Sequence, residues 1–302
     1  RQLGYLGVGG HFADYIDPML SVIIVNHESG EHLRRCLAAL PEALGETSAQ
    51  VVVVDNASQG DDLDSLEADN PSIKMIRNPE NRGYGRACNQ GVTAASAALL
   101  CFLNPDTIPR PGCLDKMVTR MNADPEAGAI GPSIYNSDGT LYPSCRVVPS
   151  LPVALGHAFF GLVWPNNPFT LRYQLGNWDH KSDRVVDWIS GAAMLVRREA
   201  FVQAGGFDEG FFMYAEDVDL CDRLRSAGWK IVYQPEACMT HHAAGSTRRA
   251  PYRMIRHHHF SLIRYAYNKT KGSPRILGFP FVAAALLARM GLLWLKKAMG
   301  GR

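Results

Sequence analysis

Acidic residues are missing from the C-terminal part of the sequence. From Ser246 onward the 302-residue chain has no Asp or Glu, although 12 of its 31 Lys and Arg residues lie there. The part before Ser246 holds all 29 acidic residues. Such an asymmetry indicates an anionic partner for the C-terminal part, either a membrane surface or nucleic acid, with a solvated basic face as the alternative.

Paired cysteines are missing as well. The seven cysteines include no CxxC pair, and most of them lie within apolar runs. This pattern argues against a disulfide-stabilised secreted domain and predicts reduced, mostly buried thiols in a cytosolic setting. The first residues lack the charged and long apolar regions of a signal peptide, so residues 1–20 are expected to form a loose N-terminal extension.

One stretch near the C-terminus is apolar over nearly the length of a membrane-spanning helix. Residues 276–295 are interrupted only by Pro280 and Arg289, and Lys296 and Lys297 follow. A spanning helix needs about 20 residues, but an arginine near the middle makes spanning costly. A helix in the membrane interface and a buried terminal helix therefore stay open as alternatives.

Short apolar runs alternate with segments of helical spacing in the first part of the chain. Strands are expected at 21–27, 51–58, 73–79 and 98–106, and later at 185–197 and 230–242. The alternation predicts an α/β fold with a Rossmann-like, mostly parallel sheet flanked by helices. The Pro- and aromatic-rich residues 140–183 are expected to form a lid or an acceptor-binding insertion, or simply to pack on the domain.

Polar side chains stand at the carboxyl ends of these expected strands. They are Asn26, Asp55, Asn78 and Asp106. Ligands of open α/β sheets bind beyond those ends, so together the residues predict a polar site, although each alone is also a common turn former. Asp106 is a candidate ligand for Mg²⁺ or Mn²⁺, and His241 adds a possible nitrogen ligand.

An acidic cluster opens the helix that is expected from Ala215 to Gly228. It consists of Glu216, Asp217, Asp219 and Asp222. Acid in the first turn suits the helix dipole, which alone explains the cluster. A helix start at a pocket edge can instead direct Glu216 or Asp217 inward as a general base that the dipole keeps ionised. A glycine-containing turn at 81–91, which leads into a helix, offers backbone N–H groups to a phosphate or a sugar.

Taken in order, these segments resemble the inverting, nucleotide-sugar-dependent glycosyltransferases of family 2, which have the GT-A fold. The resemblance covers residues 21–264, and its segments are SVIIVNH, VVVVDNAS, NRGYGRACNQG, FLNPD, ISGAAMLVRREAF, GGFDEGFFMYAEDVDLCDRLRSAGW and HHAAGS. It points to the rhamnosyltransferase branch, whose actinobacterial members add L-rhamnose to polyprenyl-diphosphate-linked N-acetylglucosamine in cell-wall linker synthesis. It implies a catalytic domain at 21–265 with an acceptor-side insertion at 140–183, and a basic, apolar helical tail at 266–302.

The resemblance also implies a role for each matching position. Asp217 would be the general base with Glu216 beside it, and Asp106 and His241 would hold Mg²⁺ or Mn²⁺. Asn104 replaces the first carboxylate of the family's Asp-x-Asp motif, which leaves Asp106 as the main carboxylate ligand. The donor site is implied at Asn26, Asp55, Asn56, Arg82, Gly83, Asn89, Asn104 and Asp106. The acceptor side is implied at Trp188, Ser190 and Gly191.

The sequence thus predicts a membrane-associated glycosyltransferase on the cytoplasmic face of the plasma membrane, peripheral or anchored by its C-terminal tail. The expected partners are dTDP-L-rhamnose, a lipid-diphosphate-linked sugar acceptor and a membrane surface, but no nucleic acid. Another sugar and a polysaccharide or O-antigen acceptor remain an alternative, because a few pocket contacts set donor choice. A nucleic-acid-binding protein and a non-catalytic membrane scaffold are hypotheses of a different class.

Overall fold

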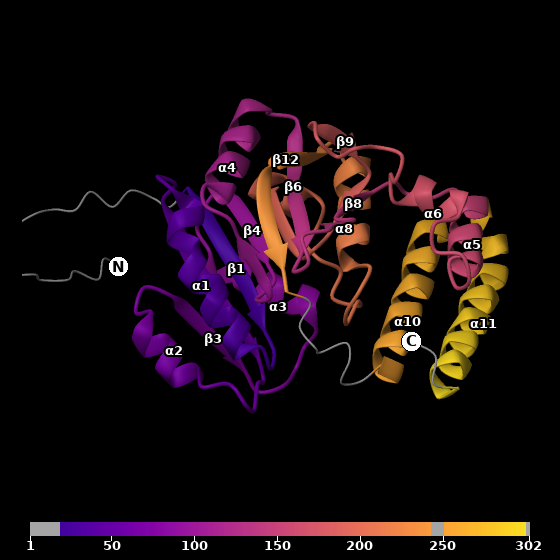
Figure 1. The fold of residues 1–302 in the computed structure, drawn as a ribbon, viewed down its shortest axis with the longest axis horizontal. Helices are drawn as coiled ribbons and strands as arrows, with labels where there is room; N and C mark the ends of the chain where they lie inside the picture. Colours follow the sequence, from indigo (N-terminus) through magenta and orange to yellow (C-terminus); the bar gives the residue numbers. More distant parts are fainter. Residues whose placement is uncertain (1–18, 243–250, 300–302) are drawn as a thin grey trace, which may run out of the picture.

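The computed structural model describes residues 19–242 and 251–299, so nearly all of the expected extension 1–20 lies outside the described residues. A large sheet carries most of the fold (Figure 1). Its strands are β1 Leu20–Asn26, β2 Ala49–Asn56, β3 Lys74–Asn78, β4 Leu99–Leu103, β5 Thr107–Pro109, β6 Ala127–Asn136, β7 Leu141–Tyr142, β9 Arg184–Val186, β11 Ala193–Arg197 and β12 Lys230–His241. A separate pair is formed by β8 Cys145–Arg146 and β10 Trp188–Ile189. The helices around the sheet are α1 Gly30–Leu44, α2 Leu63–Asp69, α3 Tyr84–Ala94, α4 Cys113–Ala123, α7 Arg198–Gln203 and α8 Glu216–Ser226.

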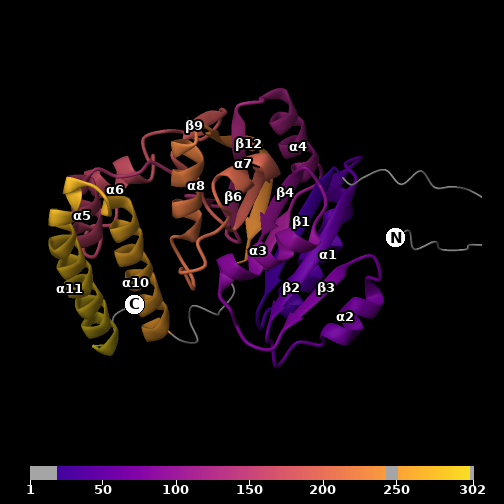
Figure 2. The same ribbon diagram turned by 180° about the vertical axis from the view of Figure 1, so that it is seen from behind.

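The main path of the sheet runs in the order β3-β2-β1-β4-β11-β6-β12-β5. The strands β3, β2, β1 and β4 are parallel to one another, as the alternation of strands and helices predicts. β11 runs antiparallel to both β4 and β6, and β5 and β9 run antiparallel to β12. The expected mostly parallel α/β sheet is therefore confirmed, with antiparallel strands in its second half. Figure 2 shows the sheet from the opposite side, with β1, β2 and β3 to the right of β6.

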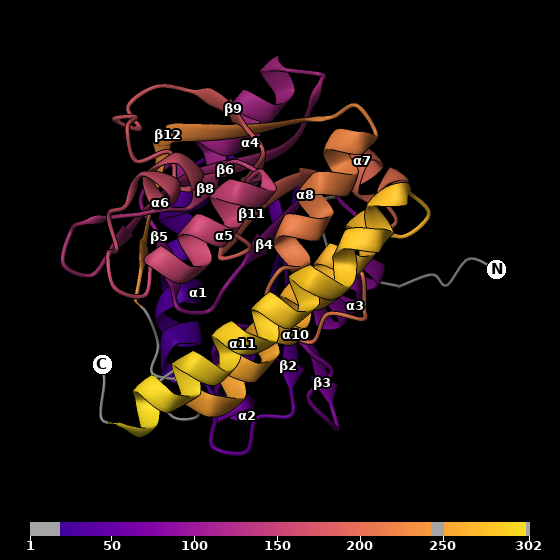
Figure 3. The same cartoon turned by 90° about the vertical axis from the view of Figure 1, so that its right-hand side faces the viewer.

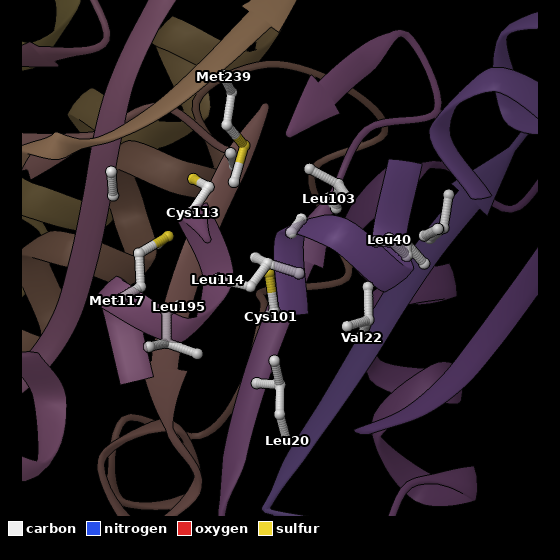
Figure 4. Packing of buried hydrophobic residues seen from close by; sticks show 14 of the residues in the cluster. Leu20, Val22, Leu40, Cys101, Leu103, Cys113, Leu114, Met117, Leu195 and Met239 are labelled. Atoms are coloured by element: carbon white, nitrogen blue, oxygen red, sulfur yellow. The ribbon is translucent and has the colours of Figure 1, made fainter. Parts of the chain in front are cut away.

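Alternating side chains of β1 explain why helices cover both faces of the sheet. Leu20, Val22 and Ile24 pack in one cluster with residues of α1 and α4, whereas Ile23 and Val25 pack in another with residues of α3 and α8. Figure 4 shows part of the first cluster, in which Cys101 and Cys113 lie among the aliphatic side chains. All seven cysteines are free and six are buried, which confirms the expectation of reduced, buried thiols.

The expectation of one continuous strand over 185–197 was wrong, because the segment divides into β9, β10 and β11. Asp187 interrupts it: its carboxylate accepts the N–H of Val148 at 2.7 Å and pairs with Arg225 at 2.8 Å. Residues 190–192 then form a turn between β10 and β11. This turn carries the backbone of Gly191 to the N-terminus of α8.

Residues 140–183 and the C-terminal part pack against each other. The first contributes α5 Leu151–Phe160 and α6 Pro168–Tyr173, and the second contributes α10 Pro251–Thr270, the 3₁₀ helix η1 Pro274–Gly278 and α11 Phe279–Ala298 (Figure 3). Arg289 of α11 donates from Nε to the carbonyl oxygen of Ala158 in α5 at 2.7 Å. The expected insertion and the expected tail thus form one helical group beside the sheet, and the expected boundary at 265/266 falls inside α10.

α10 also holds the loop that precedes α8. Arg264 binds the Asp208 carboxylate with N–O distances of 2.8–3.2 Å, and the Ser261 hydroxyl donates to the carbonyl oxygen of Met213 at 2.7 Å. The ring centroids of His257 and Phe212 lie 4.7 Å apart in a stacked arrangement. The helical group therefore helps to shape the loop on which the acidic pair is mounted.

Candidate active site

A connected set of buried polar side chains lies at the carboxyl ends of β1, β2 and β3. Asn26 Nδ2 donates to Asp55 Oδ1 at 2.9 Å, and Asn78 Nδ2 donates to Asn56 Oδ1 at 2.9 Å. Ser58 donates to the Asp55 carboxylate from its hydroxyl and from its backbone N–H. The strand register pairs these ends directly, which is why they meet. Their contact with a nucleotide stays a prediction.

A polar cavity of about 310 Å³ opens beside this set, with Asp55, Asp61 and Arg77 on its wall. Burial raises the pKa of Asp61, but hydrogen bonds from Asn26 and from backbone N–H groups outweigh it and hold that pKa below its usual value. The carboxylate is therefore ionised at neutral pH. Asp61 was not among the site residues predicted from the sequence, because nothing in its local sequence distinguishes it from an ordinary acidic turn residue.

Gly83 precedes α3 with a left-handed backbone φ of 84°. A Cβ atom at this position would lie 2.5 Å from the carbonyl oxygen of Phe212, so the close approach requires glycine. The N–H of Tyr84 donates to the same carbonyl at 3.0 Å, and the Tyr84 hydroxyl donates to the carbonyl oxygen of Gly191 at 2.9 Å. The expected donor loop is thereby fixed against the expected acceptor side at Gly191 and against the loop before α8.

The other two residues expected in this loop have different surroundings. Asn89 Nδ2 donates to the carbonyl oxygen of Phe207 at 2.9 Å, while its Oδ1 accepts the Phe207 N–H at 3.0 Å. Asn89 therefore positions the segment at Phe207 with both of its polar atoms. Arg82 is exposed and lies 3.9 Å from the carboxylate of Glu80. Donor contacts of Arg82 and Asn89 stay predictions.

Asp106 and His241 come together at one end of the sheet. His241 Nε2 lies 3.4 Å from Asp106 Oδ1, and both side chains are largely buried. Pairing of β5 with β12 fixes this distance, because Thr107 stands opposite His241 in the register. One carboxylate oxygen and one imidazole nitrogen fit Mn²⁺, or Mg²⁺, when a diphosphate and water supply the remaining ligands.

Asn104 precedes Asp106 by two residues, and its backbone N–H donates to the carbonyl oxygen of Ala192 at 2.9 Å. Within residues 19–242 and 251–299, no group of three or more His, Cys, Asp or Glu side chains is arranged to hold a metal ion. The described part of the chain thus supplies a partial ligand set. Such a set suits an ion that enters together with a phosphorylated donor.

Asp217 lies at the first turn of α8 with its carboxylate held from two sides. Its Oδ2 accepts the N–H of Gly191 at 2.9 Å and its Oδ1 accepts the N–H of Val218 at 2.8 Å. Two successive left-handed residues, Tyr214 with φ 70° and Ala215 with φ 63°, deliver the chain into the helix. Backbone strain of this kind gathers where a side chain must be held in one direction.

Glu216 is the more perturbed member of the pair. Burial and the neighbouring charge of Asp217 raise the pKa of Glu216 to about 8. Burial also raises the pKa of Asp217, against hydrogen bonds from Gly191 and Val218 and the charge of Arg146. We expected the helix start to keep the base ionised, but burial has the larger effect on both carboxyl groups. Asp217 loses its proton first, because its oxygens accept N–H bonds while Glu216 Oε2 is buried without a partner in the described chain.

A Glu216→Gln variant is expected to gain stability over the wild type as the pH rises. The folded-state pKa of about 8 lies above the ordinary 4.5, so the folded chain favours the protonated form. This contribution is fully present below pH 4.5 and is lost as the pH rises toward 8, whereas Gln does not titrate. The measurement is Tm against pH for both proteins.

The matched control for this measurement is Glu209→Gln, since the Glu209 carboxylate is half-exposed beside Arg86. Its Tm difference from the wild type is expected to vary little over the same pH range. A pH-independent difference for Glu216→Gln would contradict the buried, proton-binding state of Glu216.

The expected acceptor side, Trp188, Ser190 and Gly191, reaches Asp217 through Gly191. Gly191 donates to its carboxylate, and Trp188 is buried in β10 opposite Arg146 of β8. The Arg146 guanidinium lies over the Trp188 ring, 4.8 Å from its centroid. Sequence reasoning missed both Tyr84, which lay within a quoted motif, and Arg146, which no motif marked.

The remaining acids of the cluster, Asp219 and Asp222, form ion pairs with neighbouring basic side chains. Asp219 pairs with Arg223 at 2.7 Å, and Asp222 lies 4.0 Å from Arg225. Lys269 of α10 also pairs with Asp222. The four acids at the start of α8 therefore have different surroundings: Asp219 and Asp222 form ion pairs, whereas Glu216 and Asp217 do not pair with any described residue.

Comparison with protein families gives two matches along the chain. Residues 21–181 match the model described as Glycosyl transferase family 2, and residues 183–299 match the model described as Glycosyl transferase family 21. An N-acetylglucosaminyl-diphospho-decaprenol L-rhamnosyltransferase of Mycobacterium tuberculosis is 39% identical over 265 residues, which is 84% of this chain and 86% of that protein. Rhamnosyltransferase WbbL of Escherichia coli is 46% identical over 88 residues, 29% of this chain and 33% of that protein.

Solved structures have the same fold. A mannosyltransferase from Pyrobaculum calidifontis, in complex with GDP-Man and Mn²⁺, superposes with a TM-score of 0.58 at 16% identity. The superposition covers 95% of this chain and 77% of that chain.

Proposed function

Because the chain belongs to glycosyl transferase family 2, we propose that it transfers L-rhamnose from dTDP-L-rhamnose to a polyprenyl-diphosphate-linked N-acetylglucosamine. The observation that carries the choice of substrates is the 39% identity with the mycobacterial rhamnosyltransferase, which extends over most of both chains. Inverting glycosyl transfer itself follows from the family. The scaffold and nucleic-acid hypotheses have no comparable support.

Asp217 has the geometry of a general base for such a transfer. Two backbone N–H groups orient its carboxylate at the turn that carries Gly191, and the expected acceptor side lies there. The acceptor hydroxyl gives its proton to Asp217 while its oxygen attacks the anomeric carbon of the sugar. The bond from that carbon to the nucleoside diphosphate breaks on the opposite face, so one displacement inverts the carbon. Glu216 retains its proton beside the base.

Asp106 and His241 are the residues that we assign to a divalent cation, and Asn104 stands two residues before Asp106 in the sequence. When bound, Mg²⁺ or Mn²⁺ neutralises charge on the departing diphosphate. Asn26, Asp55 and the cavity beside them would hold the nucleoside, as ends of parallel strands do in open α/β sheets.

The helical group is proposed to lie on the cytoplasmic face of the plasma membrane. The segment Pro274–Ala298 is long and apolar enough to cross a bilayer, with a mean hydropathy of 2.0, and its most apolar window is not buried. Arg289, near the middle of this segment, hydrogen-bonds to the backbone of α5 and contacts His259 of α10. We favour a helix that lies along the interface over a spanning helix, because α11 is fixed to the chain at this central point.

A donor panel tests the proposed substrates. The purified full chain, with Mn²⁺ or Mg²⁺ and a prenyl-diphosphate N-acetylglucosamine acceptor, is incubated with dTDP-L-rhamnose, dTDP-glucose, UDP-galactose and GDP-mannose, and products are identified by mass spectrometry. We expect rhamnose transfer to exceed transfer of the other sugars by at least about 100-fold, since pocket contacts to sugar hydroxyls discriminate strongly. Preferred transfer of another sugar would favour the alternative of an O-antigen or polysaccharide transferase.

A further inference from the structure

A cluster of basic side chains lies where the helical group meets the acceptor side, and the functions assigned so far do not use it. We call it the basic cluster, and its members are Arg146 of β8, His157 of α5, His258 and His259 of α10, and Arg289 of α11. Four elements that are far apart in the sequence thus contribute to one place. Figure 3 shows α11 crossing this side of the molecule with α10 behind it and α5 beside it.

Packing holds the basic cluster together. Arg289 Nη1 lies 3.0 Å from His259 Nε2, while its Nε is bonded to α5. Arg146 Nη1 donates to the hydroxyl of Tyr173 at 3.2 Å, and the rings of Tyr173 and His157 are 4.7 Å apart. These contacts fix both guanidinium groups and leave the second terminal nitrogen of each without a hydrogen bond to a described residue.

Among the described residues no acidic side chain forms a direct ion pair with the arginines of the basic cluster, although the charge of Arg146 opposes the rise in the pKa of Asp217. Neither Arg146 nor Arg289 has a carboxylate within 4.0 Å anywhere in 19–242 or 251–299, although most arginines of the sheet domain are paired. Burial, together with the arginine charges, lowers the pKa of His258 to about 3 and that of His157 to about 4. Partly buried positive charge without a direct ion-pair partner is costly in a folded protein, and an anionic ligand would offset that cost.

The position of the basic cluster indicates which anion it meets. On one side, Arg146 stands opposite Trp188, and Gly191 of the same segment donates to the base Asp217. On the other side, α5, the turn after it and α11 carry exposed apolar side chains, namely Leu155, Phe160, Val163, Trp164, Phe281, Leu287, Leu292 and Leu295. Across this side of the protein, the proposed base therefore comes first, the positive charge second and the apolar surface third. A lipid-linked acceptor has the matching order of sugar hydroxyl, diphosphate and hydrocarbon.

We propose that Arg146 and Arg289 bind the diphosphate of the lipid-linked acceptor, which places the acceptor hydroxyl at Asp217 and the lipid along α5 and α11. The proposal rests on the proposed function for the kind of acceptor, but it is independent of which sugar is transferred. Guanidinium groups match phosphate oxygens in shape and charge. Arg289, which interrupts the apolar run, would thus serve the substrate.

The test compares Arg289→Gln with the wild type in acceptor kinetics at saturating donor. We expect the KM for a prenyl-diphosphate N-acetylglucosamine to rise about tenfold or more, because hydrogen bonds to a charged group are lost. An alkyl β-N-acetylglucosaminide, which has no diphosphate, should be used equally well by both proteins. Arg289→Lys should recover part of the loss, and Arg256→Gln, an exposed arginine of α10, is the matched control and should behave as the wild type.

Several results would overturn the proposal. One is an unchanged KM for the diphosphate acceptor, and another is an equal loss on the acceptor without diphosphate, which indicates a structural role. A third is weaker binding of dTDP by Arg289→Gln, which would assign the cluster to the donor diphosphate. If no sugar is transferred by the wild type, the proposed function fails, and calorimetry with geranylgeranyl diphosphate still decides the inference. Binding at least about tenfold weaker by Arg289→Gln than by Arg256→Gln would support it, and equal binding would overturn it.

Discussion

An Asp217→Asn variant is expected to lose about 10²- to 10⁴-fold in kcat while it binds dTDP like the wild type. The amide oxygen can still accept the N–H of Gly191 at the position of Oδ2, while the bond from the Val218 N–H to Oδ1 is lost, so the contact between the turn and the helix start should persist. What is lost is the basic oxygen that we propose takes the proton of the acceptor hydroxyl. Steady-state transfer rates and calorimetric titration with dTDP measure the two properties separately.

The matched control for this variant is Asp222→Asn on the same helix. Asp222 pairs with Lys269 and Arg225, away from Gly191, and its change should leave kcat within about twofold of the wild type. Near-normal turnover by Asp217→Asn would remove the base assignment. Loss of turnover by Glu216→Gln with normal turnover by Asp217→Asn would exchange the roles of the two acids.

Much of the sheet could be predicted from sequence because its first strands are buried on both faces. Such strands must be short, continuous apolar runs, and polar residues at their ends then mark one edge of the sheet. Asn26 and Asp55 were found in this way, and the parallel register explains why they meet. The acidic pair could be singled out because two adjacent acids at a helix start are a distinctive local pattern, and its catalytic role stays a prediction.

Other features could not be predicted because they depend on contacts between distant segments. In the sequence, Arg289 is simply a charged residue that interrupts an apolar run. Its contacts with Ala158 and His259 arise only when α11 packs on α5 and α10. Arg146 lies in a two-residue strand with no periodicity to mark it. The break of the segment 185–197 depends on Asp187 reaching Val148 and Arg225, which no local pattern reveals.

The second large effect is expected at the proposed cation site. Asp106→Ala should lose at least about 100-fold in kcat/KM, because Lewis-acid stabilisation of a departing diphosphate is worth several kcal/mol. It should also lose Mn²⁺ binding in the presence of dTDP, a readout by calorimetry or electron paramagnetic resonance that needs no turnover. The His241→Ala variant loses the imidazole nitrogen but keeps the Asp106 carboxylate, whose Oδ1 lies 3.4 Å from that nitrogen in the wild type. Its Mn²⁺ binding and kcat/KM should therefore fall less than those of Asp106→Ala. Normal Mn²⁺ binding by Asp106→Ala would contradict the site.

The matched variant for this prediction is Asn104→Asp, which supplies the carboxylate that the family motif has and this chain lacks. If Asp106 holds the ion with a single carboxylate, a second one beside it should lower the Mn²⁺ concentration needed for half-maximal binding in the presence of dTDP. Divalent cations bind more tightly as the charge of their oxygen ligands increases. The backbone N–H of residue 104 keeps its bond to Ala192, so the turn should not move. Weaker binding by Asp106→Ala together with tighter binding by Asn104→Asp would support an ion held at Asp106 within reach of residue 104, whereas no change in Asn104→Asp would leave Asp106 and His241 as ligands without residue 104.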